Sequence, residues 1–444
     1  MKRILVAVGA LGVVLAIPAV CFFFWPASIQ AVQATHAQPT GPALVAKGEY
    51  LTKAADCAAC HTAPGGEPFA GGRAFKLPFG TIFSSNITPD RETGIGQWSD
   101  AEFVRAVHRG IGRNGEDLYP AFPYTAYALL STDDVLAIRA YLSTVRPVSL
   151  RNTDNTLVFP FNQRYTLRAW KLLFVPTRPW EPSAAHGAAW NRGAYLAEAL
   201  AHCGECHTPR NLMFATKSDR KYAGAVVDGW KAYNITSDSE TGIGAWSDAD
   251  VEQYLSSGHA PARGSAGGGM GEAIDLSLRH LSSEDIVALR RYLRTIPAQR
   301  SELAVQIDHH PATLNGATAW SPGPDRSEGI GFQIFASACA SCHGWDGNGQ
   351  QTDHAELLGS PTVNDSSGAN LVRAVLEGIK MGSPGANTMP PFAAAYSDEE
   401  IAAVSNYVIG HFGGKQGSVT AAEVRASRDS GGSPSSPRGS SRMN

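Results

Sequence analysis

Apolar residues recur at helical spacing in three pairs of segments along this chain. The first member of each pair follows a glycine, at position 48, 193 or 331, and ends at a short run that contains two cysteines. The second member starts with a serine that has an acidic residue three positions later, which is the pattern of an N-terminal capping box. These closing helices are predicted over residues 131–145, 282–296 and 397–411.

Two crossing helices are the frame of a small all-α domain, so the pattern predicts a mainly α protein with three tandem domains. A glycine in the first helix of each pair would let an aromatic residue of the second helix approach closely. The expected contacts are Gly48–Tyr141, Gly193–Tyr292 and Gly331–Tyr407.

Breaks in the helical pattern divide the chain into five parts. Proline-containing joins lie over residues 151–184 and 298–325, and the end of the chain is rich in Ser, Gly and Arg without periodicity. We expect an N-terminal membrane anchor or signal segment over 1–40, domains over 41–150, 185–300 and 325–415, and a disordered tail over 416–444.

An internal repeat relates the first two domains. A block that begins at Asn86 matches a block that begins at Asn234, and both contain Glu-Thr-Gly-Ile-Gly followed by Trp-Ser-Asp-Ala. The offset is 148 residues, close to the 146 residues that separate the two cysteine motifs. The third domain lacks this block and is therefore predicted to be a different subtype.

Composition narrows the class of protein. The chain has 444 residues and is 43% hydrophobic, which excludes disorder of the whole chain. Its net charge of −3 argues against a nucleic acid partner, because binding phosphates needs a basic face.

The N-terminus has the pattern of a membrane anchor. Lys2 and Arg3 precede 22 uncharged positions, residues 4–25, whereas the apolar region of a signal peptide is usually about 7–15 residues long. Cleavage after Ala34 or Ala37 is the alternative. An anchor would keep Lys2 and Arg3 in the cytoplasm, and in either case we expect the rest of the chain to be exported.

Six of the seven cysteines form three Cys-x-x-Cys-His motifs, which are the attachment pattern of c-type haem. A zinc site would need two further Cys or His ligands at finger-like spacing, and a redox dithiol would not require the histidine. Three covalently bound haem c groups are therefore predicted. Their thioether bonds would form at Cys57, Cys60, Cys203, Cys206, Cys339 and Cys342, and His61, His207 and His343 would ligate the iron.

Methionine is the expected sixth ligand of two haems, because a thioether opposite histidine raises the reduction potential. Met270, in a glycine-rich loop, and Met389 each precede a closing helix. The first domain has Phe122 at the position that corresponds to Met270, and phenylalanine cannot bind iron. His108 is either a ligand of the first haem or a surface residue of a helix, so that sixth ligand stays unknown.

With these features the chain resembles the triple-haem cytochrome c subunits of bacterial membrane-bound dehydrogenases, over residues 42–415. The resemblance implies an electron carrier on the periplasmic side of the inner membrane. Its partner would be a catalytic subunit that holds PQQ, flavin or molybdenum, and ubiquinone or an oxidase would accept the electrons. The alcohol dehydrogenase branch usually has methionine where this chain has Phe122. The stretches 169–174 and 190–193 are closer to molybdenum-associated cytochromes.

The leading hypothesis is an electron-transfer subunit with no substrate chemistry of its own, serving a dehydrogenase of an alcohol, aldehyde, sugar acid or N-heterocycle. A haem enzyme of the peroxidase type, with an open first haem at Phe122, is the alternative. A cytochrome subunit of a terminal oxidase is a third hypothesis. No nucleotide, PQQ or flavin motif is evident, so we expect the substrate to be recognised by another subunit.

Overall fold

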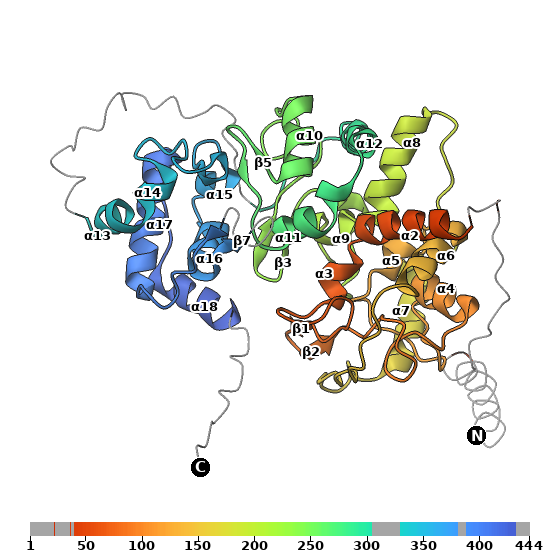
Figure 1. Cartoon of the computed structure of the whole chain (residues 1–444). Helices are drawn as coiled ribbons and strands as arrows, with labels where there is room; N and C mark the ends of the chain where they lie inside the picture. The colour runs from red at the N-terminus through yellow and green to blue at the C-terminus, as the bar shows by residue number, and fades with distance from the viewer. Residues whose placement is uncertain (1–21, 23–35, 37–39, 304–328, 381–387, 432–444) are drawn as a thin grey trace, which may run out of the picture. The chain divides into compact units, whose positions relative to one another are not determined.

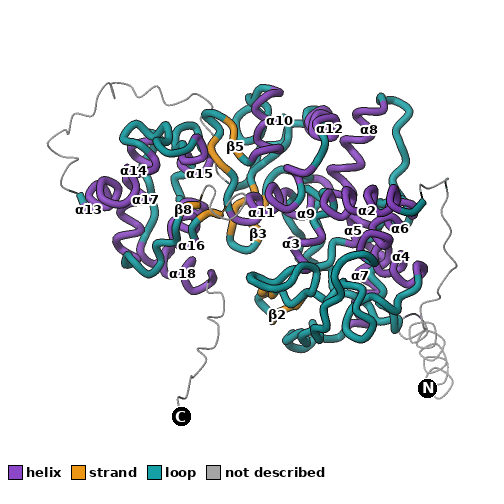
Figure 2. Tube along the Cα trace, in the orientation of Figure 1, coloured by secondary structure: helices purple, strands orange, loops and turns teal. Residues whose placement is uncertain are grey.

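The computed structural model describes residues 22, 36, 40–303, 329–380 and 388–431. Within them the chain is mainly helical, and the strands form short two-stranded hairpins separated by long loops (Figures 1 and 2). The chain divides into two compact units. The first runs to Gly187 and adds Ala194–Glu205 and Leu212–Ala215, and the second holds the remaining residues. The predicted division into three domains stays a prediction.

The first unit consists of helices and one hairpin. Its helices are α2 (Pro42–Ala54), α3 (Cys57–His61), α4 (Asp100–Arg109), α5 (Tyr124–Tyr127), α6 (Thr132–Leu142) and α7 (Leu167–Phe174), with a 3₁₀ turn at Arg164–Thr166. Antiparallel strands β1 (Ala74–Leu77) and β2 (Gly80–Phe83) pair Leu77 with Gly80 at the turn. Helix α7 lies in the stretch that the sequence predicted only as a join.

The second cysteine motif lies on a helical segment that has residues in both units. This segment consists of α8 (Ala188–Tyr195), a π-helical turn (Leu196–Leu200) and α9 (Gly204–His207).

The second unit contains the other elements. Its helices are α10 (Asp248–Ser257), α11 (Gly268–Leu276), α12 (Ser283–Leu293), α13 (Ile330–Ile334), α14 (Ala340–His343), α15 (Pro361–Asn364), α16 (Ala369–Glu377), α17 (Asp398–Phe412) and α18 (Ala421–Gly431). Single helical turns lie at Ser218–Arg220, Leu278–His280, Phe335–Cys339 and Asp353–Ala355. Its antiparallel hairpins pair β3 (Ala225–Val227) with β4 (Trp230–Ala232), β5 (His259–Ala260) with β6 (Gly264–Ser265), and β7 (Ile379–Lys380) with β8 (Thr388–Met389).

The three predicted glycine–tyrosine contacts are confirmed. A Cβ atom placed on the glycine would lie 2.9 Å from Cβ of Tyr141 in the first pair, and 3.0 Å from that of Tyr292 or Tyr407 in the others. A backbone carbonyl of the closing helix would be closer still in each pair. The glycines lie inside the first helices and do not precede them: Gly48, for example, is the seventh residue of α2. They are needed because the two backbones nearly touch.

Serine caps all three closing helices, as predicted, but only one of them has a complete capping box. The hydroxyls of Ser131, Ser282 and Ser397 accept hydrogen bonds from backbone N–H groups three residues later. Glu400 returns the bond to Ser397. The carboxylates of Asp134 and Asp285 instead bind the Tyr195 hydroxyl and the Arg192 guanidinium. Tertiary partners therefore replace the local bond at two of the three caps.

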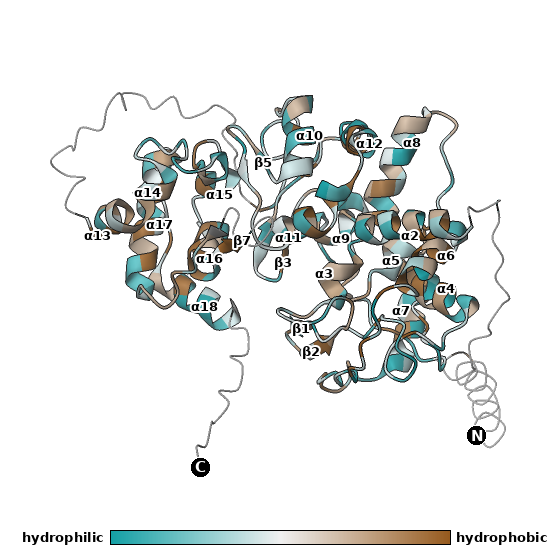
Figure 3. Ribbon diagram, in the orientation of Figure 1, coloured by the Kyte–Doolittle hydropathy of each residue, from teal (hydrophilic) through white to brown (hydrophobic). Residues whose placement is uncertain are grey.

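The expected disordered tail is wrong for residues 421–431, which form helix α18. This helix packs beside α17, and Val424 is fully buried in the core that also includes Ile401 and Ile409. Arg428 reaches back to Asp398 at 2.9 Å. Figure 3 shows brown, apolar stretches on α16 and α17 beside the teal α18. The sequence pattern missed this helix because most of its residues are polar.

The predicted membrane anchor lies outside the described residues, apart from Phe22. Among the helices that the structure does describe, none is long and apolar enough to span a membrane.

A methyl group at the third helix crossing should destabilise the protein. We expect Gly331→Ala to lower the free energy of unfolding by about 1–3 kcal/mol, because its Cβ would clash with the backbone of Ala403. Gly410→Ala is the matched control, since its Cβ would meet only the Lys415 carbonyl oxygen at 3.7 Å. Denaturant unfolding followed by circular dichroism measures both. Equal stability of the two variants would contradict the role of Gly331.

Candidate haem-binding sites

Each Cys-x-x-Cys-His motif lies on one turn of helix, which brings its cysteines and histidine together. Helix α3 contains the whole first motif, and α9 and α14 end at the second and third histidines. The residue before the first cysteine is left-handed in two motifs, Asp56 with φ 52° and His202 with φ 39°. The third motif continues instead from a π-helical turn. This difference agrees with the predicted separate subtype.

The three motif histidines are oriented in the same way. Nδ1 of His61 donates to the carbonyl of Ser85 at 2.7 Å, and Nδ1 of His207 to that of Tyr233 at 2.6 Å. In the third motif, Nδ1 of His343 donates to Ala355 at 2.7 Å. A carbonyl only accepts, so this bond places the proton on Nδ1 and leaves the Nε2 lone pair for a metal. An imidazole that binds iron requires this arrangement.

The repeated asparagines fix two of these carbonyl groups. Asn86 directly follows Ser85, and its side-chain amide donates to the Val148 carbonyl at 2.7 Å while its oxygen accepts from the backbone N–H of Thr88. Asn234 makes the equivalent bond to the carbonyl of Gln299, also at 2.7 Å. The asparagines therefore tie the acceptor loop to the chain beyond the closing helix.

Burial sets the protonation state of the motif side chains. It lowers the pKa of His61, His207 and His343 and so favours the neutral imidazole, which is the form that ligates a metal. Burial also raises the pKa of Cys57 to about 12 and that of Cys339 to about 11. Such thiols are protonated near neutral pH, unlike the thiolates of redox-active cysteines. In the described part of the chain no group of three or more His, Cys, Asp or Glu residues is placed to hold a metal ion.

The two candidate methionines lie in neighbouring elements of the second unit. Met389 belongs to β8 and packs against the core around α17. Met270 lies in the first turn of α11 rather than in a loop, so that expectation was wrong. A Cβ atom on Gly267, just before α11, would be 3.3 Å from Cδ1 of Ile379, which pairs with Met389 across β7 and β8. The structure thus brings the two methionine segments together, whereas iron ligation by either stays a prediction.

The first motif has an aromatic residue where the repeat predicts a ligand. Phe122 packs in a cluster with Tyr124 and Trp170. Nε2 of His108 is buried without a hydrogen-bond partner in the described structure, and burial lowers the pKa of this imidazole to about 4. His108 is therefore not the solvated surface residue that its position on a helix allowed. The sixth ligand of the first haem stays open.

Two features that sequence reasoning missed lie beside the first two motifs. The Tyr127 hydroxyl donates to the Ala55 carbonyl at 2.6 Å, two residues before Cys57. The Tyr127 ring also packs against His202, next to Cys203, with ring centroids 5.5 Å apart. Nothing local in the sequence signals this contact, because the residues are about 75 positions apart.

The side chains present fit haem. The six motif cysteines form no disulfide in the described structure, as thioether attachment of haem requires. The indole Nε1 of Trp246 is buried with no hydrogen-bond partner among the described residues, so it is available to a polar group of a ligand. Attachment turns, oriented neutral imidazoles and a helical frame together define a c-type cytochrome.

Comparison with known proteins places the chain within that class. It is 38% identical over 419 residues to the fructose dehydrogenase cytochrome subunit of Gluconobacter japonicus, covering 89% of this chain and 86% of the relative. It is 38% identical over 405 residues to the gluconate 2-dehydrogenase cytochrome c subunit of Pantoea cypripedii, covering 87% and 90%. The chain belongs to this family of dehydrogenase cytochrome subunits, which confirms the resemblance.

Two further matches agree with this assignment. The chain is 38% identical over 422 residues to a nicotinate dehydrogenase subunit from Pseudomonas putida, covering 90% of this chain but 33% of that longer protein. Residues 329–408 match the family model of cytochrome c oxidase, cbb3-type, subunit III, which supports a cytochrome c domain around the third motif.

Loss of a methionine ligand should lower the potential of one haem. We expect Met270→Ala and Met389→Ala each to lower one midpoint potential and to weaken the sulfur-to-iron charge-transfer absorbance of the oxidised protein. Met213→Ala is the control, because this methionine is 48% exposed and has no predicted role. Optical redox titration makes the measurement. Unchanged spectra and midpoints in Met270→Ala would remove it from the set of ligands.

Proposed function

We propose that this protein is a tri-haem c-type cytochrome on the periplasmic side of the bacterial inner membrane. It carries electrons from a partner dehydrogenase to ubiquinone or a terminal oxidase. The observation that carries the proposal is the shared orientation of His61, His207 and His343, each held through Nδ1 on a backbone carbonyl. Relatives named as cytochrome subunits of fructose and gluconate dehydrogenases support a dehydrogenase as the electron donor.

The residues of this chain have separate tasks in that function. The motif cysteines would hold three haem c groups covalently, the motif histidines would ligate the iron through Nε2, and Met270 and Met389 would ligate two of the irons from the opposite side. Bound haem supplies a one-electron couple whose potential depends on axial ligand, hydrogen bonding and burial. The chain controls the last two, because it partly buries each imidazole and fixes the partner of its Nδ1.

Membrane attachment rests on the uncharged stretch over residues 4–25, which is long enough to span a bilayer. The two positive residues before it support an exported main chain.

A second candidate function is a haem enzyme that uses an open first haem. The observation in its favour is Phe122, which lies where a methionine is expected and packs on Tyr124 and Tyr127. Without a ligand from this position, a small molecule could reach the iron of the first haem. Electron transfer is the preferred function, because it uses all three motifs.

Pull-down of the tagged full-length protein from its native membrane should bring a catalytic dehydrogenase subunit with it. We expect that complex to reduce the cytochrome when its substrate is added. The recovered cofactor, PQQ, flavin or molybdopterin, identifies the substrate class. A tagged unrelated membrane protein from the same cells is the control. Recovery of the haem-loaded cytochrome without any dehydrogenase would contradict the proposed partner.

If His108 does not ligate the first haem, carbon monoxide should bind to that haem in the reduced protein, because Phe122 offers no ligand. Phe122→Met should reduce that binding by supplying a thioether, and Phe161→Met, at a position that is 41% exposed, should leave it unchanged. Difference absorbance spectra with carbon monoxide measure both. Peroxide turnover by the wild-type protein that disappears in Phe122→Met would favour the haem enzyme instead.

A further inference from the structure

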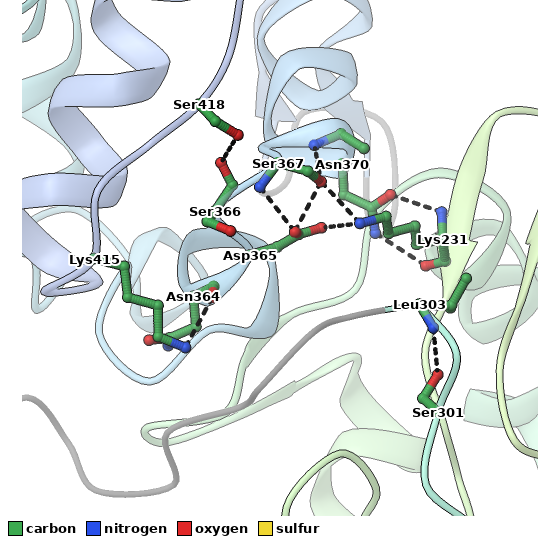
Figure 4. A network of polar contacts seen from close by, with 11 residues as sticks. Lys231, Ser301, Leu303, Asn364, Asp365, Ser366, Ser367, Asn370, Lys415 and Ser418 are labelled. Carbon is green, nitrogen blue, oxygen red and sulfur yellow. Dashed lines mark hydrogen bonds and ion pairs between the residues drawn. The ribbon is translucent and has the colours of Figure 1, made fainter.

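A buried ion pair in the second unit joins residues that follow the second motif to residues that follow the third. Nζ of Lys231, in β4, lies 2.7 Å from Oδ2 of Asp365, and the two side chains are only 14% and 3% exposed. Asp365 is itself held by the backbone N–H and the hydroxyl of Ser367. Figure 4 shows these side chains converging between the two segments.

Asn370 adds two hydrogen bonds between the same segments. Its Oδ1 accepts from the backbone N–H of Lys231 at 2.8 Å, and its Nδ2 donates to the Lys231 carbonyl at 3.0 Å. The side-chain amide thus pairs with β4 as a neighbouring strand would. Asn370, in helix α16, thus fixes the backbone of Lys231, and Asp365, four residues before α16, pairs with its charge.

Strand β4 leads directly to the carbonyl that orients the second motif histidine. Tyr233 lies two residues after Lys231, and its carbonyl accepts from Nδ1 of His207 at 2.6 Å. Burial raises the pKa of the Tyr233 hydroxyl, and the charge of Asp365 raises it further, which places Asp365 near this residue. A shift of β4 would therefore move the acceptor of His207.

The packing between these segments is close along its length. A Cβ atom on Gly264 would lie 2.5 Å from the hydroxyl oxygen of Ser360, and one on Gly229 would clash with the guanidinium of Arg373. The hydroxyl of Ser265 donates to the His354 carbonyl at 2.8 Å, directly before Ala355, which accepts from His343. The carbonyl groups that orient His207 and His343 are thus both next to this interface.

We propose that Lys231, Asp365 and Asn370 are positioning residues for the second haem. By fixing β4 they hold the Tyr233 carbonyl on His207, so that residues that follow the third motif set the potential of the second haem. This inference rests on the proposed haem-carrying function. A hydrogen bond from Nδ1 makes the imidazole a stronger donor and stabilises ferric iron, so weakening it raises the potential.

The test compares three substitutions by optical redox titration of the full haem-loaded protein. Asn370→Ala changes no charge, Lys231→Met removes a positive charge, and Asp365→Asn removes a negative one. We expect all three to raise the second midpoint, with a three- to tenfold change in the reduced-to-oxidised ratio at fixed potential, about 30–60 mV. The second haem is the one whose midpoint falls in Met270→Ala.

A direct charge effect would give a different pattern. It predicts a lower midpoint for Lys231→Met, a higher one for Asp365→Asn, cancellation in the double variant and no change in Asn370→Ala. That result would overturn the proposal. Positioning predicts that the double variant shifts upward at least as far as either single change. If the charged variants do not fold, Asn370→Ala alone decides.

The control is Glu240→Gln, which breaks a pair between Arg300 and Glu240 whose side chains are 63% and 60% exposed. It should leave every midpoint unchanged. Unaltered midpoints in haem-loaded Asn370→Ala overturn this inference and leave the proposed function intact. A wild-type protein that carries no haem would instead overturn the proposed function, and the inference with it.

Discussion

The hydrogen bond from Nδ1 of each motif histidine to a backbone carbonyl is the constraint on which the rest of the structure depends. It fixes the tautomer and the direction of the ring, and it requires a loop from elsewhere in the chain to present a carbonyl at about 2.7 Å. Two sets of repeated residues hold the carbonyl loops and the motif helices in place. The repeated Asn86 and Asn234 anchor two of the loops, and the glycine crossings hold the helix before each motif against its closing helix.

The segments that follow the second and third motifs share an interface, and Tyr127 contacts residues next to the first and second motifs. Lys231 and Asp365 bury opposite charges in that interface, which is favourable only because each is also hydrogen-bonded or paired. Near the first motif, aromatic residues replace polar partners: Phe122 packs on Tyr124 and Tyr127. The same family of domains thus supports two kinds of environment, which is how a cytochrome can give its haems different potentials.

Sequence reasoning succeeded where a function needs fixed local spacing. The cysteine motifs and the serine caps follow from short-range patterns, and the serine bonds are confirmed. The glycine–tyrosine contacts, between residues 76–99 positions apart, follow from the pairing of two predicted helices and are also confirmed. It failed where a distant partner overrides the local pattern. The carboxylates of Asp134 and Asp285 bind tertiary partners and do not complete a capping box. The polar helix α18 folds because Val424 is buried in a hydrophobic core.

By itself, the sequence determined the class of protein and predicted the attachment residues and the histidine that would face each iron, because covalent haem attachment demands one turn of helix with fixed residue types. Only the tertiary structure decided which carbonyl orients each histidine, since Ser85, Tyr233 and Ala355 lie 12–26 residues away from their imidazoles and could be any residue type. It likewise decided the pairing of Lys231 with Asp365, 134 residues apart. Every residue has a backbone carbonyl, so the sequence does not show which one accepts the hydrogen bond. A long-range ion pair forms only once folding brings its two residues together.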